Sequence, residues 1–176
     1  MDDTHRKSSR IIRLTDQEGN PLSDTEVSCE QTKHEFLFGC GAGDAVAAAN
    51  PGGDAVADAV VKDRFEKWLK IFNFGTTHFY WDRFEPERGK PMTDVLMRGA
   101  RLLKDHGIPV KGHPLCWHTL APKWLLEMDE DEILRELLAR IERDVTAFRG
   151  TIDMWDVINE VVIMPVFDKY DNGITR

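Results

Sequence analysis

Apolar and polar residues follow two different periods along this chain, and the period changes several times. Short apolar runs bounded by glycine, proline or polar residues are typical of buried strands. Apolar positions that recur every three or four residues, with charged residues between them, indicate amphipathic helices. The runs predict strands over residues 36–39, 73–79, 108–113 and 152–158, and the stripes predict helices over residues 61–72, 95–103 and 133–148.

Strands and helices therefore alternate, which predicts a parallel sheet with right-handed crossovers. An open doubly wound sheet that binds a nucleotide would carry a helix directly after a glycine-rich turn. Residues 39–43 are glycine-rich, but residues 41–53 are rich in Ala, Gly, Asp and Pro and predict a long loop. A (β/α)8 TIM barrel fits the spacing, and it needs about 250 residues. We therefore expect an α/β fold of the TIM-barrel type with about its first four βα units.

The beginning of the chain predicts a separate small element. Residues 11–14 and 25–29 have the composition of short strands, and the Gly-Asn-Pro sequence at 19–21 is a turn signal between them. We expect residues 1–34 to form N-terminal strands or a hairpin, and residues 35–176 to form the N-terminal half of the barrel.

Composition excludes several classes of function. The net charge of -8 provides no excess of Lys and Arg to neutralise a nucleic-acid backbone. No apolar run approaches the roughly 20 residues that span a bilayer, so we expect no membrane insertion. The first residues lack the apolar core of a secretory signal, which is compatible with a cytoplasmic protein or with a processed secreted chain.

Three scattered cysteines do not form a disulfide framework. Cys116 lies between His113 and His118, but a structural zinc site requires four ligands at recognised spacings, and no second cluster supplies them. On a strand, the two histidines would also lie on opposite faces. We expect neither a metal nor a cofactor.

Polar and aromatic side chains gather where three predicted strands end. The carboxyl ends of the strands form the catalytic edge of a barrel. A carboxylate at this edge, next to an amide that can bond a hydroxyl group, is suited to general acid/base chemistry. Tryptophans beside hydrogen-bonding groups suit a sugar ring, which has an apolar face and a rim of hydroxyls. The candidates are His78, Tyr80 and Trp81, then His113 and Trp117, and finally Asn159 and Glu160.

Three of these stretches resemble a known family. Residues 81–90 (WDRFEPERGK), 111–118 (KGHPLCWH) and 155–160 (WDVINE) are similar, in order and spacing, to three successive signatures of glycoside hydrolase family 10. That family comprises retaining endo-β-1,4-xylanases built on a (β/α)8 barrel. The resemblance covers residues 39–160, and the predicted hairpin is similar to extra N-terminal strands of some members.

The resemblance implies a role for each matching residue. Glu160 would be the general acid/base, Asn159 would bond the 2-hydroxyl of the sugar, and His113 and Trp117 would line the subsite of the sugar that is attacked. Retaining hydrolysis needs a second carboxylate about 5–5.5 Å away as nucleophile. The family carries it on the seventh strand, and no carboxylate of this chain matches that motif. We therefore expect a fragment that is inactive alone.

Two departures leave the substrate open. Thr76, Thr77 and Tyr80, with His78 between them, stand at the positions where the family has a Glu-Asn pair and a Lys, and Leu120 replaces a common Gln. The expected partner is a polysaccharide or oligosaccharide, with xylan as the first expectation and β-glucan or mannan as alternatives. A non-catalytic carbohydrate-binding half-barrel is a further alternative, and its exposed sheet edges could drive self-association.

Overall fold

The computed structural model describes residues 4, 7, 9–32 and 34–160. Its contacts divide the chain into two units, residues 1–35 and 36–176. Residues 161–176, which the predicted barrel half includes, lie outside the described residues.

The first unit keeps the predicted turn but not the predicted strands. Thr15 and Pro21 form an isolated antiparallel bridge around the turn, and the carboxylate of Asp16 accepts the backbone N–H groups of Glu18 and Asn20 at 3.0 and 2.8 Å. The stretches 11–14 and 25–29 are not strands. Ile11, Ile12 and Val27 are exposed, and a two-stranded hairpin without a packed face is marginally stable at best.

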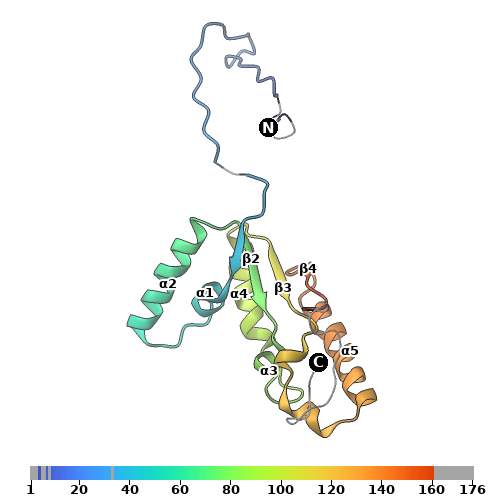
Figure 1. Cartoon of the computed structure of the whole chain (residues 1–176). Helices are drawn as coiled ribbons and strands as arrows, with labels where there is room; N and C mark the ends of the chain where they lie inside the picture. Colours follow the sequence, from blue (N-terminus) through green and yellow to red (C-terminus); the bar gives the residue numbers. More distant parts are fainter. Residues whose placement is uncertain (1–3, 5–6, 8, 33, 161–176) are drawn as a thin grey trace. The chain divides into compact units, whose positions relative to one another are not determined.

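The described part of the second unit is built on a parallel sheet with the strand order β1-β2-β3-β4 (Figure 1). Each strand pairs with the next one along the chain, and helices lie between consecutive strands. This confirms the predicted parallel α/β arrangement. The elements are β1 (Gly39–Gly41), α1 (Gly43–Ala48), α2 (Ala55–Leu69), β2 (Phe74–His78), α3 (Trp81–Phe84), α4 (Thr93–Asp105), β3 (Val110–His113), η2 (His118–Leu120), η3 (Lys123–Glu127), α5 (Glu130–Ala147) and β4 (Met154–Trp155).

The region around β1 differs from the prediction. The strand begins at Gly39 instead of Phe36, and the aromatic rings of Phe36 and Phe38 are exposed. Gly39 lies so close to β2 that a Cβ atom would be 2.8 Å from the carbonyl oxygen of Phe74. The predicted loop over residues 41–53 contains α1, whose alanines favour a helix but are too small to produce a clear apolar stripe.

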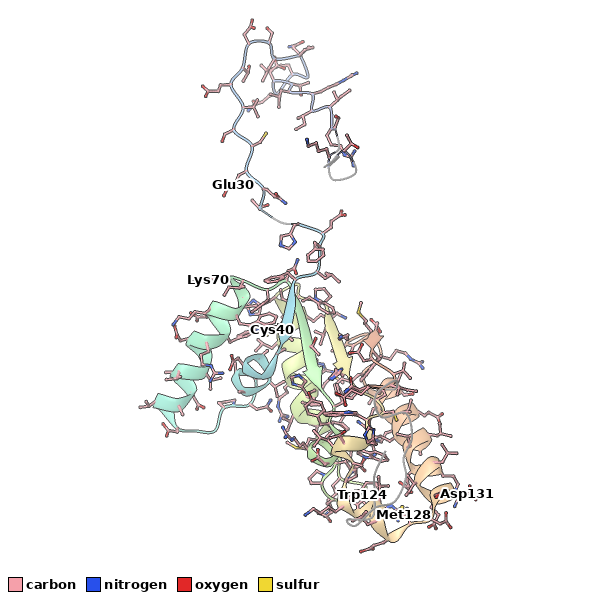
Figure 2. All side chains as sticks on the ribbon, in the orientation of Figure 1. Glu30, Cys40, Lys70, Trp124, Met128 and Asp131 are labelled. Atoms are coloured by element: carbon pink, nitrogen blue, oxygen red, sulfur yellow. The ribbon has the colours of Figure 1, made fainter. Side chains whose placement is uncertain are left out.

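Side chains from the sheet and the helices form two buried clusters. The main core includes Phe79, Leu103, Phe148 and Ile152, each at most 1% exposed. A smaller cluster lies under the loops that follow β2 and β3, and consists of Trp81, Leu125 and Leu137 with Trp124 and Met128 packed against it. Figure 2 shows Trp124 and Met128 in the segment that leads into α5. The smaller cluster supports the edge of the sheet where the candidate residues lie.

No helix in the described ranges is long and apolar enough to cross a lipid bilayer.

Gly112 on β3 provides the space for a tryptophan of the next strand. A Cβ atom at Gly112 would lie 2.2 Å from two ring carbons of Trp155. The same indole ring packs against Phe79, with ring centroids 4.8 Å apart, and against Phe148. The lack of a side chain at Gly112 therefore allows β4 to join the main core.

We expect Gly112→Ala to lower the free energy of unfolding by about 1–3 kcal/mol, because overpacking must displace the ring or the strand. Gly43→Ala is the matched control, since nothing lies within 4 Å of a Cβ atom at that position. Alanine is also the better helix former there. Chemical denaturation measures both variants. If Gly112→Ala were as stable as the control, the close packing of β3 on Trp155 would be refuted.

Candidate active site

The register of β2 and β3 brings two histidines to the same edge of the sheet. His78 and His113 are register partners at the carboxyl ends of their strands, with ring centroids 6.3 Å apart. The pairing continues one residue further, because the N–H of Phe79 donates to the carbonyl oxygen of His113 at 2.6 Å. The loops after both strands therefore start side by side.

Four rings gather on these loops, and we call them the site aromatic cluster: His78, Tyr80, His113 and Trp117. The imidazole of His78 stacks on Tyr80 with centroids 5.1 Å apart and planes inclined by 14°. Tyr80 contacts the ring of His113 edge-on at 5.9 Å and the ring of Trp117 at 5.4 Å. The structure thus brings together four of the seven predicted residues, and Tyr80 is the central member.

The fourth strand brings the predicted carboxylate to this cluster. Glu160 Oε2 accepts a hydrogen bond of 2.7 Å from the indole N–H of Trp117. The backbone N–H of Asn159 donates to the carbonyl oxygen of Cys116 at 2.9 Å, next to the parallel bridge between Cys116 and Ile158. Glu160 has a φ of 56°, in the left-handed region that residues with a side chain rarely adopt. Glu160 therefore lies in a bend that follows the bridge at Ile158, beyond the end of β4.

A second carboxylate at this edge was not among the predicted residues. Asp156 Oδ2 lies 2.7 Å from Nδ1 of His113 and 2.8 Å from Nζ of Lys111. Partial burial would raise the pKa of Asp156, but Lys111 and His113 outweigh it and lower that pKa. The sequence pattern that could have indicated this contact is the spacing of Lys111 and His113. They are two residues apart on a strand, so both side chains point to the same face and can contact one carboxylate.

His78 is neutral in this environment at neutral pH. Burial lowers the pKa of its imidazole, and electrostatic interactions with His113 and Arg83 lower it further. The face of the imidazole ring therefore stacks on Tyr80, and its two nitrogen atoms at the ring edge can form hydrogen bonds.

The structure does not bring Trp81 into the site aromatic cluster. Trp81 is 3% exposed and belongs to the smaller buried cluster. Its N–H donates to Oε2 of Glu85 at 3.1 Å, and the guanidinium of Arg140 lies 4.9 Å from its ring centroid. Trp81 is the first residue of α3, and Trp81 and Phe84 are the buried residues of this helix, whereas Tyr80 directly before it is only partly buried.

Glu85 lies in a buried ionic network beneath the loops. Its two carboxylate oxygens accept hydrogen bonds of 3.0 and 2.9 Å from the Arg143 guanidinium, and the N–H of Gly89 donates to Oε1 at 2.8 Å. Burial would raise the pKa of Glu85, but the bonds from Arg143, Gly89 and Trp81 lower it overall. Glu85 therefore fixes the turn after α3 and is not part of the site aromatic cluster.

Metal ligands do not gather in the part of the chain that the structure describes. No group of three or more His, Cys, Asp or Glu side chains there could hold a metal ion.

The fold and this edge define the chain as part of a (β/α)8 barrel, and solved structures have the same fold. The native xylanase 10B from Thermotoga maritima matches with a TM-score of 0.56 and 23% identity, over 80% of this chain and 39% of that one. Xylanase 10B from Thermotoga petrophila RKU-1 in complex with xylobiose also matches with a TM-score of 0.56 and 23% identity, over 71% and 36% of the two chains. The predicted fold class is confirmed.

Sequence comparison identifies the family. The model of glycosyl hydrolase family 10 matches residues 43–169, and the chain belongs to this family. Endo-1,4-beta-xylanase 5 of Arabidopsis thaliana is 28% identical over 167 residues, which cover 93% of this chain and 28% of that protein. Endo-1,4-beta-xylanase B of Thermotoga neapolitana is 31% identical over 55% of this chain and 30% of its own length. The chain spans less than a third of these relatives.

The buried Glu85 predicts a pH-dependent contribution to stability. Its pKa is lowered in the folded state, so it stabilises the fold above its ordinary value of 4.5 and loses this effect as the pH falls. We expect Glu85→Gln to cost about 2 kcal/mol at neutral pH, because Arg143 loses one of its two carboxylate partners, and less in acid. Urea unfolding over a pH series measures the difference, with Glu142→Gln on the exposed face of α5 as control. A pH-independent difference would contradict the assignment.

Proposed function

We propose that this chain supplies the acid/base part of a retaining endo-β-1,4-xylanase-like glycoside hydrolase, with Glu160 as the general acid/base. The observation that carries the proposal is the hydrogen bond from Trp117 to Glu160, in a chain of glycosyl hydrolase family 10. It holds a carboxyl group beside the site aromatic cluster, where a sugar ring can stack. Asn159, the preceding residue, is proposed to bond the 2-hydroxyl of the sugar.

In the proposed reaction, the carboxyl group of Glu160 protonates the glycosidic oxygen while a second carboxylate attacks the anomeric carbon. Glu160 then accepts a proton from the water that hydrolyses the glycosyl-enzyme intermediate. Glu160 thus gives one proton to the leaving group and regains another from the water, so that its carboxyl group is protonated again after each cycle.

His113 and Asp156 are proposed to orient the sugar beside this carboxyl group. Asp156 accepts from Nδ1 of His113, which leaves Nε2 of the imidazole to face a substrate hydroxyl. Lys111 balances the charge of Asp156. The neutral rings of His78 and Tyr80 extend the surface on which a sugar can pack.

The family resemblance places the nucleophile on the seventh strand of the barrel, whereas the described sheet has the order β1-β2-β3-β4. We propose that hydrolysis belongs to a complete barrel and that this chain alone is inactive. The intact mass of the protein as its source produces it tests this point. A mass near 20 kDa, combined with xylan hydrolysis, would contradict it.

Glu160→Gln should lower kcat on xylan by about 10²–10⁴-fold, because the amide cannot protonate the leaving oxygen. For aryl xylobiosides with acidic leaving groups, the rate of the bond-cleaving step should fall less, because such a leaving group departs with little protonation. Steady-state rates of the full-length protein with both substrates measure the contrast. Glu142→Gln is the matched control on the exposed face of α5. An unchanged rate on xylan would refute the role of Glu160.

One observation favours a second substrate class. Thr76, Thr77 and Tyr80 stand where the family pattern has a Glu-Asn pair and a Lys that bind sugar units, and the ring of Tyr80 stacks on His78. A related reaction on β-glucan or mannan would share Glu160 and differ only at these subsites. Rates of the full-length protein on xylan, β-glucan and mannan separate the two.

Tyr80→Ala should raise KM by roughly threefold to tenfold with a smaller change in kcat, as expected for the loss of an aromatic packing surface worth about 1 kcal/mol. Phe74→Ala at the first residue of β2 provides a control for stability, because it removes an aromatic ring at the opposite end of the strand from the site. Michaelis constants on the preferred polysaccharide test the expectation. An unchanged KM would remove Tyr80 from the proposed site.

A further inference from the structure

A buried guanidinium from α5 joins the two loops that carry the site aromatic cluster. The side chain of Arg140 is 2% exposed. Its Nη1 donates to the carbonyl oxygen of Leu115 at 2.6 Å, and its Nη2 donates to the carbonyl oxygen of Phe79. Phe79 directly precedes Tyr80, and Leu115 lies two residues before Trp117. One planar group therefore holds the backbone close to both rings.

The same two residues are also held through their N–H groups. The N–H of Phe79 donates to the carbonyl oxygen of His113, and the N–H of Leu115 donates to the carbonyl oxygen of Asp156 at 2.9 Å. Each backbone segment is thus fixed by the neighbouring strand on one side and by Arg140 on the other. The starting points of both loops are therefore defined by hydrogen bonds.

The burial of this charge is unfavourable and needs compensation. Desolvation lowers the pKa of Arg140 to about 10, so the group remains charged at neutral pH. Nε lies 3.3 Å from Oδ2 of Asp144, an ion pair without hydrogen-bond geometry, and the ring of Trp81 covers one face of the guanidinium. Only arginine offers a rigid fork that can reach two carbonyl oxygens at once.

We propose that Arg140 is a positioning residue, which sets the relative placement of Tyr80 and Trp117 and thereby the direction of the Trp117 N–H toward Glu160. A test of this inference by enzyme activity rests on the proposed function. A test by spectroscopy requires only the contact between Tyr80 and Trp117, whose ring centroids are 5.4 Å apart.

Arg140→Lys in the full-length protein tests the proposal, because lysine keeps a positive charge and loses the fork. Arg143→Lys is the matched control. It lies on the same helix and also contacts Asp144, but its other partner is Glu85 instead of the two loop carbonyls. Denaturant midpoints show whether the two variants lose comparable stability.

Two further readouts separate positioning from stability. Near-ultraviolet circular dichroism reports the coupling of Tyr80 with Trp117, assigned by its loss in Trp117→Phe, and kcat/KM on xylan reports catalysis. For Arg140→Lys we expect loss of the assigned band and about a 100-fold decrease in kcat/KM, as for a displacement of about 1 Å in a site. Arg143→Lys should keep the band and most of the activity.

Several outcomes would overturn the inference. Arg140→Lys could retain both the band and kcat/KM, or both variants could lose them in proportion to stability, which would indicate a general structural role.

If the wild-type protein cleaves no xylan, β-glucan or mannan, the proposed function fails, while the circular dichroism comparison still decides the role of Arg140. If Arg140→Lys does not fold, Arg140→Gln combined with Asp144→Asn removes both buried charges and carries the same expectations.

Discussion

The parallel register that pairs His78 with His113 is the constraint on which this edge of the sheet depends. It makes two strands end at the same level, so that the lateral hydrogen bonds continue past the strands through Phe79 and Leu115. A shift of one residue would turn the side chains of a whole strand to the opposite face. The close contact of β4 with β3 then brings Asp156 within reach of His113.

Charged side chains from α5, together with Glu85 after α3, form a network beneath the loops at this edge of the sheet. Arg140 is buried and Arg143 is half-buried, and both contact the buried carboxyl group of Asp144, while Arg143 also pairs with the buried Glu85. The pKa of Asp144 is raised, because the effect of burial is larger than the lowering by the two arginines. Such networks contribute little net stability. Their hydrogen bonds to specific carbonyl oxygens fix where the loops begin.

The sequence contained most of the fold and part of the site. Helices α4 and α5 were predictable because large apolar residues recur on one face, and the ends of the strands identified all four members of the site aromatic cluster. Helix α1 was missed because its alanines give no stripe. Arg140 was missed because a charged residue on an amphipathic helix is usually solvated. Trp81 was misplaced because composition at a strand end does not show which way a ring faces.

The two carboxyl groups at this edge have different environments, and this difference favours the proposed division of roles. Asp156 lies 2.8 Å from Nζ of Lys111 and 2.7 Å from Nδ1 of His113, and these contacts lower the pKa of its carboxyl group. Glu160 accepts from the indole N–H of Trp117, a neutral donor that orients the carboxyl group without bringing a positive charge. A group that must release and accept a proton in turn needs orientation without a fixed counter-ion. The neutral aromatic surroundings therefore suit Glu160 to proton transfer and leave Asp156 to orient His113.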